Sequence, residues 1–263
     1  MNLSLAQALR VKSPACVAFI GAGGKTTAMF QLARALSKAE GTSPVIVTAT
    51  SHLGVWQAEF ADQHIVTEAP GPLEDFEHGL KGVILVTGEV DSDRIKPIND
   101  HLLNWLREFC GYHSIPLLIE ADGARQKPLK AWKEYEPPIP SFVDLIVDVV
   151  GLIGLGKLLS EENVHRSEIF AKLSGLNIGE PITQESLVRV LKHAEGGLKN
   201  APTTARRAVL LNQADTPLLQ SRAKVLAQAL IPVFDSVIIS SLEQEKVFAV
   251  QEPIAGIILA IGS

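Results

Sequence analysis

Short apolar segments alternate with amphipathic helical segments along the chain, and this alternation limits the possible folds most strongly. Cys16–Gly21, Val45–Thr50 and Pro116–Glu120 are mainly apolar or β-branched segments of strand length. Strands that are apolar throughout are typical of parallel sheets whose connecting helices cover both faces. The sequence therefore predicts an α/β fold with a three-layer, doubly wound and mostly parallel sheet.

The other elements are expected in the same alternating order, and we expect a single domain over residues 1–263. Ser4 and Gln7 form a capping-box pattern, which predicts a short helix over 4–11. Further strands are expected over Val83–Val86, Leu145–Val150, 207–212, 236–240 and 255–262. Further helices are expected over Thr26–Ala39, Ile98–Phe109, Ser167–Leu173, Gln184–His193 and 217–230.

The composition disfavours several classes of protein. The chain has 263 residues, is 46% hydrophobic and carries a formal net charge of −5, which disfavours a nucleic-acid partner. No apolar stretch reaches the ~18 uncharged residues of a membrane span, and no signal peptide is recognisable. Cys16 and Cys110 form neither a disulfide framework nor a thiol metal site. We therefore expect a cytoplasmic protein that has no membrane partner.

The segment GAGGKTT lies between a predicted strand and a predicted helix. It differs from the phosphate-loop pattern G-x-x-x-x-G-K-[ST], because Phe19 occupies the position of the first glycine. A shorter pattern of this kind, G-x-x-G-K-T-T, occurs in amide ligases of the Mur and folylpolyglutamate type. Glycines allow the backbone N–H groups to approach phosphate oxygens, and the helix that follows favours anions at its N-terminus. The predicted nucleotide-binding residues are Gly21, Ala22, Gly23, Gly24, Lys25, Thr26 and Thr27.

Two acids follow the predicted strand Pro116–Glu120 and are expected beside this loop. The carboxyl ends of parallel strands meet at one edge of the sheet, and residues two apart on a strand point to one face. We predict that Thr26, Glu120 and Asp122 bind Mg²⁺, and that Lys25, Glu120 and Asp122 form the catalytic group. The plain alternatives are a glycine turn with a solvent-facing lysine and an acid that closes a turn.

The turn Asn212-Gln213-Ala214-Asp215 follows another predicted strand. It resembles the N-K-x-D motif with which GTPases bind guanine, with Gln213 in place of the lysine. Asn212 and Asp215 are therefore predicted to bind the base. Asn-Asp turns after strands are also common for reasons of turn geometry alone, so both ATP and GTP stay open.

Several other polar residues are candidates for the same site. Arg125, Lys127 and Lys130 follow the two acids and either bind an anion or are solvated surface charges. His52 follows the second predicted strand, and Arg166 precedes a predicted helix. Each of these two either reaches a phosphate group or only completes a turn.

Four stretches carry a resemblance to a known family. FIGAGGKTT, IEADGARQKPLKAW, VVGLIGLGKLL with ENVHRSE, and LLNQAD occur in this order between Phe19 and Asp215. Together they resemble the selenium-dependent hydroxylase accessory proteins of the YqeC type. The resemblance implies a role in maturing selenium-dependent molybdenum hydroxylases, with such an enzyme or one of its cofactor-maturation proteins as partner. The architecture also looks like that of metallochaperone GTPases, which implies a sheet of the P-loop NTPase type.

These patterns predict a Mg²⁺-dependent nucleoside triphosphatase or phosphoryl-transfer enzyme that uses ATP or GTP. One alternative is a chaperone or scaffold that uses the nucleotide as a switch and grips a hydroxylase subunit through Gly123–Ser141. Another is an ATP-dependent kinase or ligase that acts on a small anionic acceptor. The chain has no recognisable additional substrate domain of the Mur kind, which disfavours the ligase.

Overall fold

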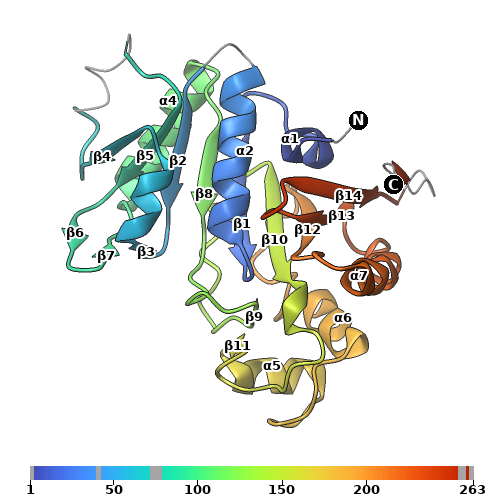
Figure 1. Ribbon diagram of the computed structural model, residues 1–263. Helices are drawn as coiled ribbons and strands as arrows, with labels where there is room; N and C mark the ends of the chain where they lie inside the picture. Colours follow the sequence, from blue (N-terminus) through green and yellow to red (C-terminus); the bar gives the residue numbers. More distant parts are fainter. Residues whose placement is uncertain (1–2, 40–42, 72–78, 254–258, 261–263) are drawn as a thin grey trace.

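A ten-stranded sheet forms the centre of the molecule in the computed structural model, which describes residues 3–39, 43–71, 79–253 and 259–260 (Figure 1). Its strands in chain order are β1 (Cys16–Gly21), β2 (Val45–Ala49), β4 (Gln63–Val66), β5 (Val83–Thr87), β8 (Leu117–Glu120), β10 (Leu145–Gly151), β12 (Arg206–Asn212), β13 (Ser236–Ser241), β14 (Lys246–Gln251) and β15 (Leu259–Ala260). Across the sheet they are ordered β15-β14-β13-β12-β10-β1-β8-β2-β5-β4.

The eight strands from β4 to β13 in this order are parallel, and β14 and β15 add antiparallel pairs at one edge. The prediction of an α/β fold with a mostly parallel sheet is therefore confirmed. β1 lies between β8 and β10, so strands that come later in the chain are found on both sides of it. Ligands of open parallel sheets bind outside the carboxyl ends of the strands at such a reversal of strand order.

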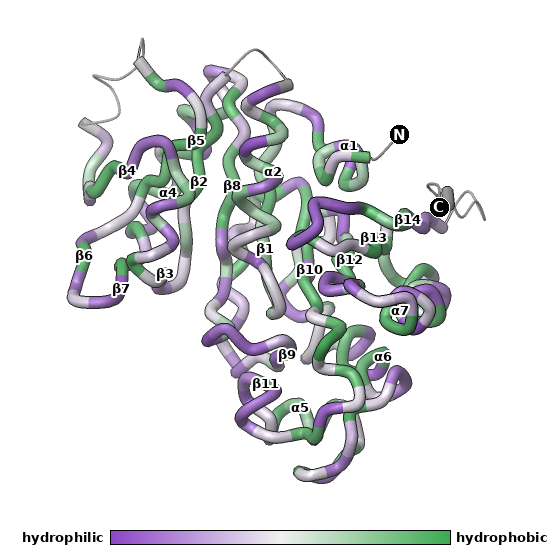
Figure 2. Tube along the Cα trace, in the orientation of Figure 1, coloured by the Kyte–Doolittle hydropathy of each residue, from purple (hydrophilic) through white to green (hydrophobic). Residues whose placement is uncertain are grey.

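Helices cover both faces of the sheet. They are α1 (Leu5–Leu9), α2 (Lys25–Ala39), α4 (Asp100–Tyr112), α5 (Ser167–Ser174), α6 (Gln184–Lys192) and α7 (Pro217–Leu230), with two 3₁₀ helices, η1 (Val55–Phe60) and η2 (Leu152–Gly154). α1 and α2 pack on one face, and α4, α6 and α7 pack on the other. Figure 2 shows the contrast between the hydrophobic strands and the hydrophilic segments around β9 (Leu129–Lys130) and β11 (Val164–His165).

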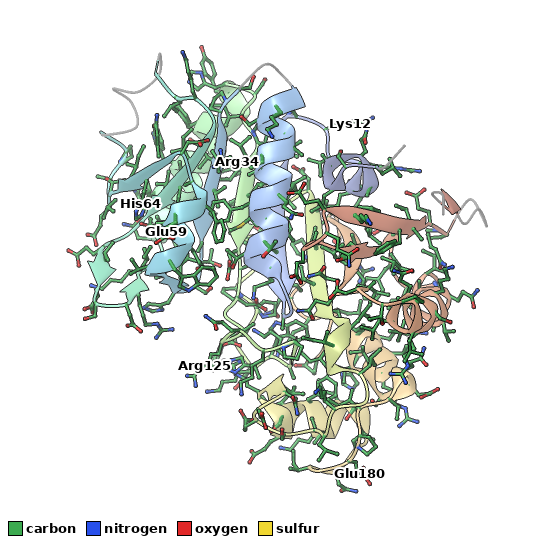
Figure 3. The ribbon with its side chains drawn as sticks, viewed as in Figure 1. Lys12, Arg34, Glu59, His64, Arg125 and Glu180 are labelled. Atoms are coloured by element: carbon green, nitrogen blue, oxygen red, sulfur yellow. The ribbon has the colours of Figure 1, made fainter. Side chains whose placement is uncertain are left out.

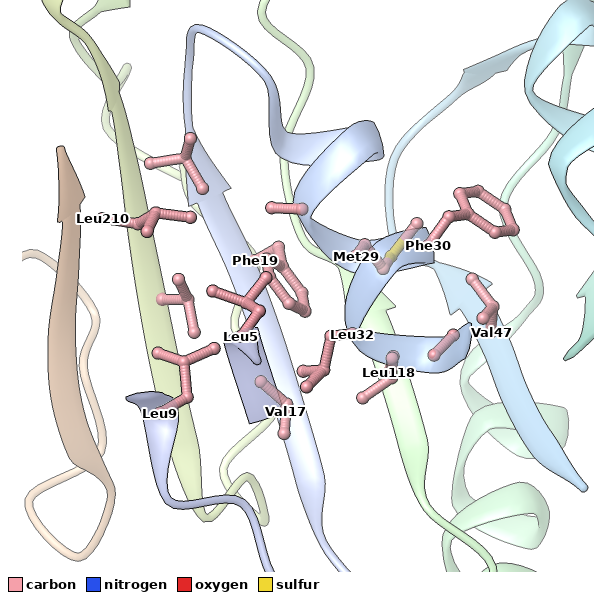
Figure 4. Close-up of a cluster of buried hydrophobic side chains, with 14 of the residues drawn as sticks. Leu5, Leu9, Val17, Phe19, Met29, Phe30, Leu32, Val47, Leu118 and Leu210 are labelled. Atoms are coloured by element: carbon pink, nitrogen blue, oxygen red, sulfur yellow. The ribbon is translucent and has the colours of Figure 1, made fainter. Parts of the chain in front are cut away.

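Alternate side chains of β1 enter different cores. Phe19 packs with Met29 and Leu32 of α2 in one hydrophobic cluster (Figure 4). Ile20, the next residue, belongs to the cluster on the opposite face, which includes Leu102 of α4. Each of these five side chains is at most 1% exposed, which explains why β1 has no polar alternation. This packing holds the end of β1, and with it the glycine loop, at a fixed place.

Two small sheets stand beside the large one. β3 (Leu53–Gly54), β7 (Arg94–Ile95) and β6 (Val90–Asp91) form a three-stranded sheet, and β9 pairs in parallel with β11. None of these strands was predicted, because a two-residue strand is too short to show a hydrophobic period. Both small sheets lie toward the carboxyl ends of the parallel strands, and residues of β3 and β7 line the cavity described below.

The predicted elements agree with the structure apart from their ends and the two edges of the large sheet. The capping box is confirmed, since the Ser4 side chain accepts from the Gln7 N–H and the Gln7 side chain accepts from the Ser4 N–H. β4 and β14 were not predicted. Of the strand predicted over 255–262, only Leu259–Ala260 lies within the described residues. Within the described residues no helix is long and apolar enough to span a membrane. The single domain stays a prediction.

Candidate functional site

The glycine loop between β1 and α2 has a backbone that only glycine adopts readily. Gly21, Gly23 and Gly24 have φ values of 90°, 85° and 119°. A Cβ atom at Gly23 would lie 2.4 Å from the Cα atom of Gly151, and one at Gly24 would lie 2.5 Å from Nδ2 of Asn212. The three glycines are therefore required both by the turn and by the close approach of the ends of β10 and β12.

The start of α2 presents unpaired backbone N–H groups next to this loop. The Ala28 N–H donates to the Gly24 carbonyl at 2.9 Å, so the N–H groups of Lys25, Thr26 and Thr27 precede the first bond of the helix. The partial positive charge of a helix N-terminus adds to these donors. A strand, a glycine turn and a helix N-terminus together form a suitable place for an anion.

Lys25 is the centre of a buried group of charges. Its side chain is 4% exposed, and Nζ donates to the Gly21 carbonyl at 2.9 Å. Nζ lies 3.1 Å from Oδ1 of Asp122 and 3.9 Å from Oε1 of Glu120. Burial by itself would lower the pKa of Lys25, but the attraction of Asp122 and Glu120 outweighs burial and raises it. Lys25 is therefore charged at neutral pH and does not face solvent.

Asp122 holds several parts of the site together. Its Oδ2 atom accepts from the Gly21 N–H at 3.0 Å and from Nε1 of Trp132 at 2.6 Å. Nζ of Lys130 lies 2.9 Å from the same oxygen. Burial would raise the pKa of Asp122, but Lys25, Lys130 and the Gly21 N–H lower it together. Asp122 thus joins the glycine loop to the segment that follows β8.

Glu120 contacts the hydroxyl group beside Lys25. Thr26 Oγ1 donates to Oε2 of Glu120 at 3.2 Å, and Nε2 of Gln57 donates to both of these oxygens. Burial raises the pKa of Glu120 more than Lys25 lowers it. Gln57 was missed at the sequence level, because it lies in η1, which no local pattern connects to the glycine loop. It brings a neutral amide to the two predicted metal ligands.

A third buried acid, Asp148, lies under the glycine loop. It is in register with Ile20 of β1, and neither of its carboxylate oxygens has a hydrogen-bond partner among the described residues. A Cβ atom at Gly21 would lie 2.4 Å from its Oδ1. Burial, with the charge of Asp122, raises the pKa of Asp148 well above its usual range. Burial thus favours the neutral form of Asp148, and its position inside an apolar strand concealed it from the sequence patterns.

In the turn after β12, Asn212 and Asp215 differ in their hydrogen bonds. Nδ2 of Asn212 donates to the Gly23 carbonyl at 2.8 Å, and its Oδ1 accepts from the Leu242 N–H at 3.0 Å. Asn212 thus fastens the glycine loop to the ends of β12 and β13. By contrast, Oδ1 of Asp215 is buried without a hydrogen-bond partner in the part of the chain that the structure describes. Asp215 therefore has an acceptor without a partner there, but of this turn only Gln213 lines the cavity described below.

A cavity of about 660 Å³ extends from the glycine loop to the small sheet of β3 and β7. Its walls come from Gly23–Thr27, from β3 and η1, from β7, and from residues 123–128. Lys25, Arg94, Arg125 and Lys127 are its cationic lining residues, and Asp93 and Glu120 are its acids. Figure 3 shows Arg125 at the border of the lower part of the molecule, below β3 and β7. The lining is thus net positive in a chain whose net charge is −5.

Two of the other candidates, Arg166 and Lys130, have structural partners, and so does Thr50. The Thr50 hydroxyl, at the end of β2, donates to the Pro138 carbonyl at 3.1 Å. Arg166 forms an ion pair with Glu136, and Lys130 is inside the charge cluster, where burial lowers its pKa to about 8. His52 lines the cavity.

The segment Gly123–Ser141, suggested as a partner surface, is in part interior. Ala131 is fully buried and Trp132 is 3% exposed, because the indole reaches Asp122. Residues 123–128 line the cavity instead.

We expect His165 of β11 to lower the stability of the protein in mild acid. Burial, with the nearby cations Lys130 and Arg125, lowers the pKa of His165 from 6.5 to about 4. As pH falls through this interval, the unfolded chain binds a proton that the native state does not, so the free energy of unfolding decreases. In His165→Gln, urea unfolding between about pH 7 and pH 4.5 should show a shallower decrease. The exposed His101→Gln is the control, and identical slopes in all three proteins would contradict the expectation.

Comparison with known proteins adds a family relationship. The family model described as "YqeC protein" matches residues 17–168, which include the glycine loop, Glu120 and Asp122. The chain is also 34% identical over 209 residues to a protein of Escherichia coli (strain K12), covering 77% of each chain. That relative has the name "Uncharacterized protein YqeC".

Proposed function

The chain belongs to the YqeC family, and from the geometry of its site we propose that it is a Mg²⁺-dependent nucleoside triphosphatase. The observation that carries this proposal is the convergence of Lys25, Thr26 and Glu120 at the glycine loop. Thr26 Oγ1 and Glu120 Oε2 are 3.2 Å apart, and Lys25 Nζ is 3.9 Å from the same carboxylate. We also propose that the sheet is of the P-loop NTPase type, because β8 with its acids pairs directly with β1.

The residues present fit a magnesium ion and a triphosphate. Mg²⁺ prefers oxygen donors and is usually held by one or two protein side chains together with phosphates and water. Thr26 and Glu120 are two adjacent oxygen donors at the start of α2. The burial that raises the pKa of Glu120 is opposed by any nearby cation, so a bound metal ion would keep this carboxylate ionised.

The proposed reaction is attack of water on the terminal phosphate, giving a nucleoside diphosphate and inorganic phosphate. A Mg²⁺ ion held by Thr26 and Glu120 would neutralise phosphate charge. The ammonium group of Lys25 binds and neutralises phosphate oxygens. The amide of Gln57 orients the Thr26 hydroxyl and the Glu120 carboxylate. Asp122 positions Lys25 without contacting the phosphates.

Asp215 favours guanine as the base. A carboxylate only accepts hydrogen bonds, and guanine presents two neighbouring donors, N1–H and N2–H₂, on one edge, whereas adenine lacks this pair. Asp215 has an oxygen without a partner, and Asn212 is occupied with the loop. We therefore propose GTP rather than ATP, with Asn212 acting on the loop and Asp215 on the base.

The cellular role that we propose follows the family. In this proposal GTP hydrolysis drives a step in maturing a selenium-dependent molybdenum hydroxylase in the cytoplasm, and the partner is that enzyme or one of its maturation proteins.

Calorimetric titration with GTP and ATP, each with Mg²⁺ and with EDTA, tests the function. We expect GTP to bind only weakly without Mg²⁺, and phosphate release to follow binding. Failure of both nucleotides to bind would overturn the proposal. Tight binding without phosphate release would favour a nucleotide-operated switch, in which the contacts of Gln57 with Thr26 and Glu120 link the nucleotide site to η1.

Replacing Asp215 with alanine should reduce the affinity for GTP by about tenfold and leave the affinity for ATP unchanged, since one charged hydrogen-bond acceptor contributes about 1.5–3 kcal/mol. Competition between the two nucleotides measures this preference directly. Asp235→Ala is a poor comparison, because Asp235 accepts from the Arg207 N–H. The exposed Glu243 is the suitable control. Equal loss of ATP and GTP in Asp215→Ala would contradict a role in recognising the base.

A further inference from the structure

One wall of the cavity, outside the glycine loop, combines an aromatic side chain with cations. It is built from η1 and the turn between β6 and β7, which are joined by the Val55 N–H donating to the Asp93 carbonyl at 3.2 Å. Trp56 and Arg94 face the cavity from this wall, and Arg125 and Lys127 line it from the segment after β8. These residues belong neither to the phosphate loop nor to the turn that we assign to the base.

Trp56 is exposed but held in place. It is 46% exposed, and its ring makes an edge-on contact with Phe60 at 5.8 Å between centroids. Phe60 in turn packs on Phe30 of α2 at 5.4 Å. A Cβ atom at Gly54 would lie 2.4 Å from Nε1 of Trp56, so the glycine provides room for the indole. A supported indole that faces a cavity is a surface on which a flat ring stacks.

Three cations that line the cavity make no salt-bridge contact among the described residues, although Lys127 helps to lower the pKa of Glu161 and Asp91 is opposite Arg94 in the β6–β7 pair. Among the residues that the structure describes, Arg94, Arg125 and Lys127 form no ion pair, whereas Lys25, Lys130 and Arg166 all do. Arg125 and the next residue, Gln126, both have positive φ values, 49° and 59°. Consecutive left-handed residues that are not glycine are uncommon, and they occur preferentially at ligand sites. Unpaired guanidinium groups that line a cavity favour an anion.

We propose that this wall binds a second small molecule, a flat aromatic anion that carries a phosphate or carboxylate group. Its ring stacks on Trp56, and its anionic group lies between Arg94 and Arg125. Asp93 offers an acceptor to ring N–H groups, which favours a nitrogen heterocycle. The inference rests on the proposed function in one respect, because it assumes that nucleotide phosphates occupy the glycine loop. Gln57, the neighbour of Trp56, connects this wall to Thr26 and Glu120.

Three matched probes separate the ring from the charge. 1-Naphthyl phosphate has both features, 1-naphthol has only the ring, and cyclohexyl phosphate has only the charge. In calorimetric titrations of protein saturated with Mg²⁺ and a slowly hydrolysed GTP analogue, we expect 1-naphthyl phosphate to bind about tenfold more tightly than either of the others. Trp56→Ala and Arg125→Ala should each weaken its binding by about tenfold, with the nucleotide affinity unchanged.

Two exposed residues outside the cavity provide controls. Tyr112→Ala removes an aromatic side chain that is 85% exposed on α4, and Lys192→Ala removes an exposed cation on α6. Both should bind 1-naphthyl phosphate like the parent protein. Protein that binds nucleotide but not 1-naphthyl phosphate would overturn the second site, as would equal binding by Trp56→Ala and Tyr112→Ala.

The same titrations without nucleotide distinguish the two proposals. If the protein binds no GTP but still requires Trp56 and Arg125 for 1-naphthyl phosphate, the nucleotide function fails and the second site stands. If the probe instead binds equally to all variants, the second site fails whatever the nucleotide does.

Discussion

Replacing Lys25 with methionine should lower the affinity for Mg²⁺–GTP by about 100-fold or more, because the loop loses the charged hydrogen-bond donor nearest to the phosphates. Lys25 is held at the loop by the Gly21 carbonyl and by Asp122. Methionine has a similar length and removes only the charge and the donor. Titration calorimetry with a slowly hydrolysed GTP analogue measures the effect.

Lys38→Met is the matched control, because Lys38 is an exposed lysine in the last turn of the same helix. Lys25→Met also leaves two buried carboxylates without their shared cation, and its folding must be verified by circular dichroism. Lys25→Arg keeps the charge but replaces the compact ammonium group, which contacts the Gly21 carbonyl and Asp122, with a larger planar group, so it should bind GTP more weakly than the parent protein. Unchanged affinity in either folded variant would contradict the phosphate-binding role of Lys25.

Replacing Asp122 with alanine should lower the free energy of unfolding by about 3–5 kcal/mol, because it leaves Lys25 and Lys130 buried without their common partner. The same change removes the acceptor of the Gly21 N–H and of Trp132 Nε1. Urea unfolding, monitored by circular dichroism, measures the loss. Asp122→Ala should therefore be among the most destabilising single changes at this edge of the sheet.

Glu89→Ala is the control for this effect. Glu89 pairs with Lys96 at 2.9 Å, but both side chains are about half exposed or more, so its loss should change stability by no more than about 1 kcal/mol. The pKa of Asp122 is lowered in the folded state, so its contribution is present above the ordinary carboxyl range and is lost as pH falls. The difference between the parent protein and Asp122→Ala should therefore shrink in acid. Equal stability of the Asp122 and Glu89 variants at neutral pH would contradict this account.

Most of the large sheet was predictable because strands buried on both faces are short, mainly apolar segments in the sequence. β1, β2, β8 and β10 are mainly apolar, and the structure covers them with helices on two sides. The positions of β3, β7, β9 and β11 were not predictable, since strands of two residues depend on their partners and have no period of their own. Of these short strands, β3 and β7 nevertheless contribute residues to the cavity lining.

The candidate site was predictable in part. Lys25, Thr26, Glu120 and Asp122 were expected near one another, and the structure places their side chains within contact distance. Their functions stay predictions. The structure also separates the two acids, since Asp122 is bound by lysines and a backbone N–H, whereas Glu120 faces the Thr26 hydroxyl. The two-residue spacing of Glu120 and Asp122 does not predict that their partners differ.

The sequence by itself determined the local features of this protein: where the strands run, that a loop with three glycines precedes a helix, and that acids end a neighbouring strand. These follow from backbone preferences and from the periodicity of burial, which act over a few residues. Only the tertiary structure decided that Gln57 reaches Thr26, that both carboxylate oxygens of Asp148 lack a hydrogen-bond partner among the described residues, and that Trp56 lines the same cavity as Arg94 and Arg125. Such contacts join segments that are tens of residues apart, and strand order and packing determine them.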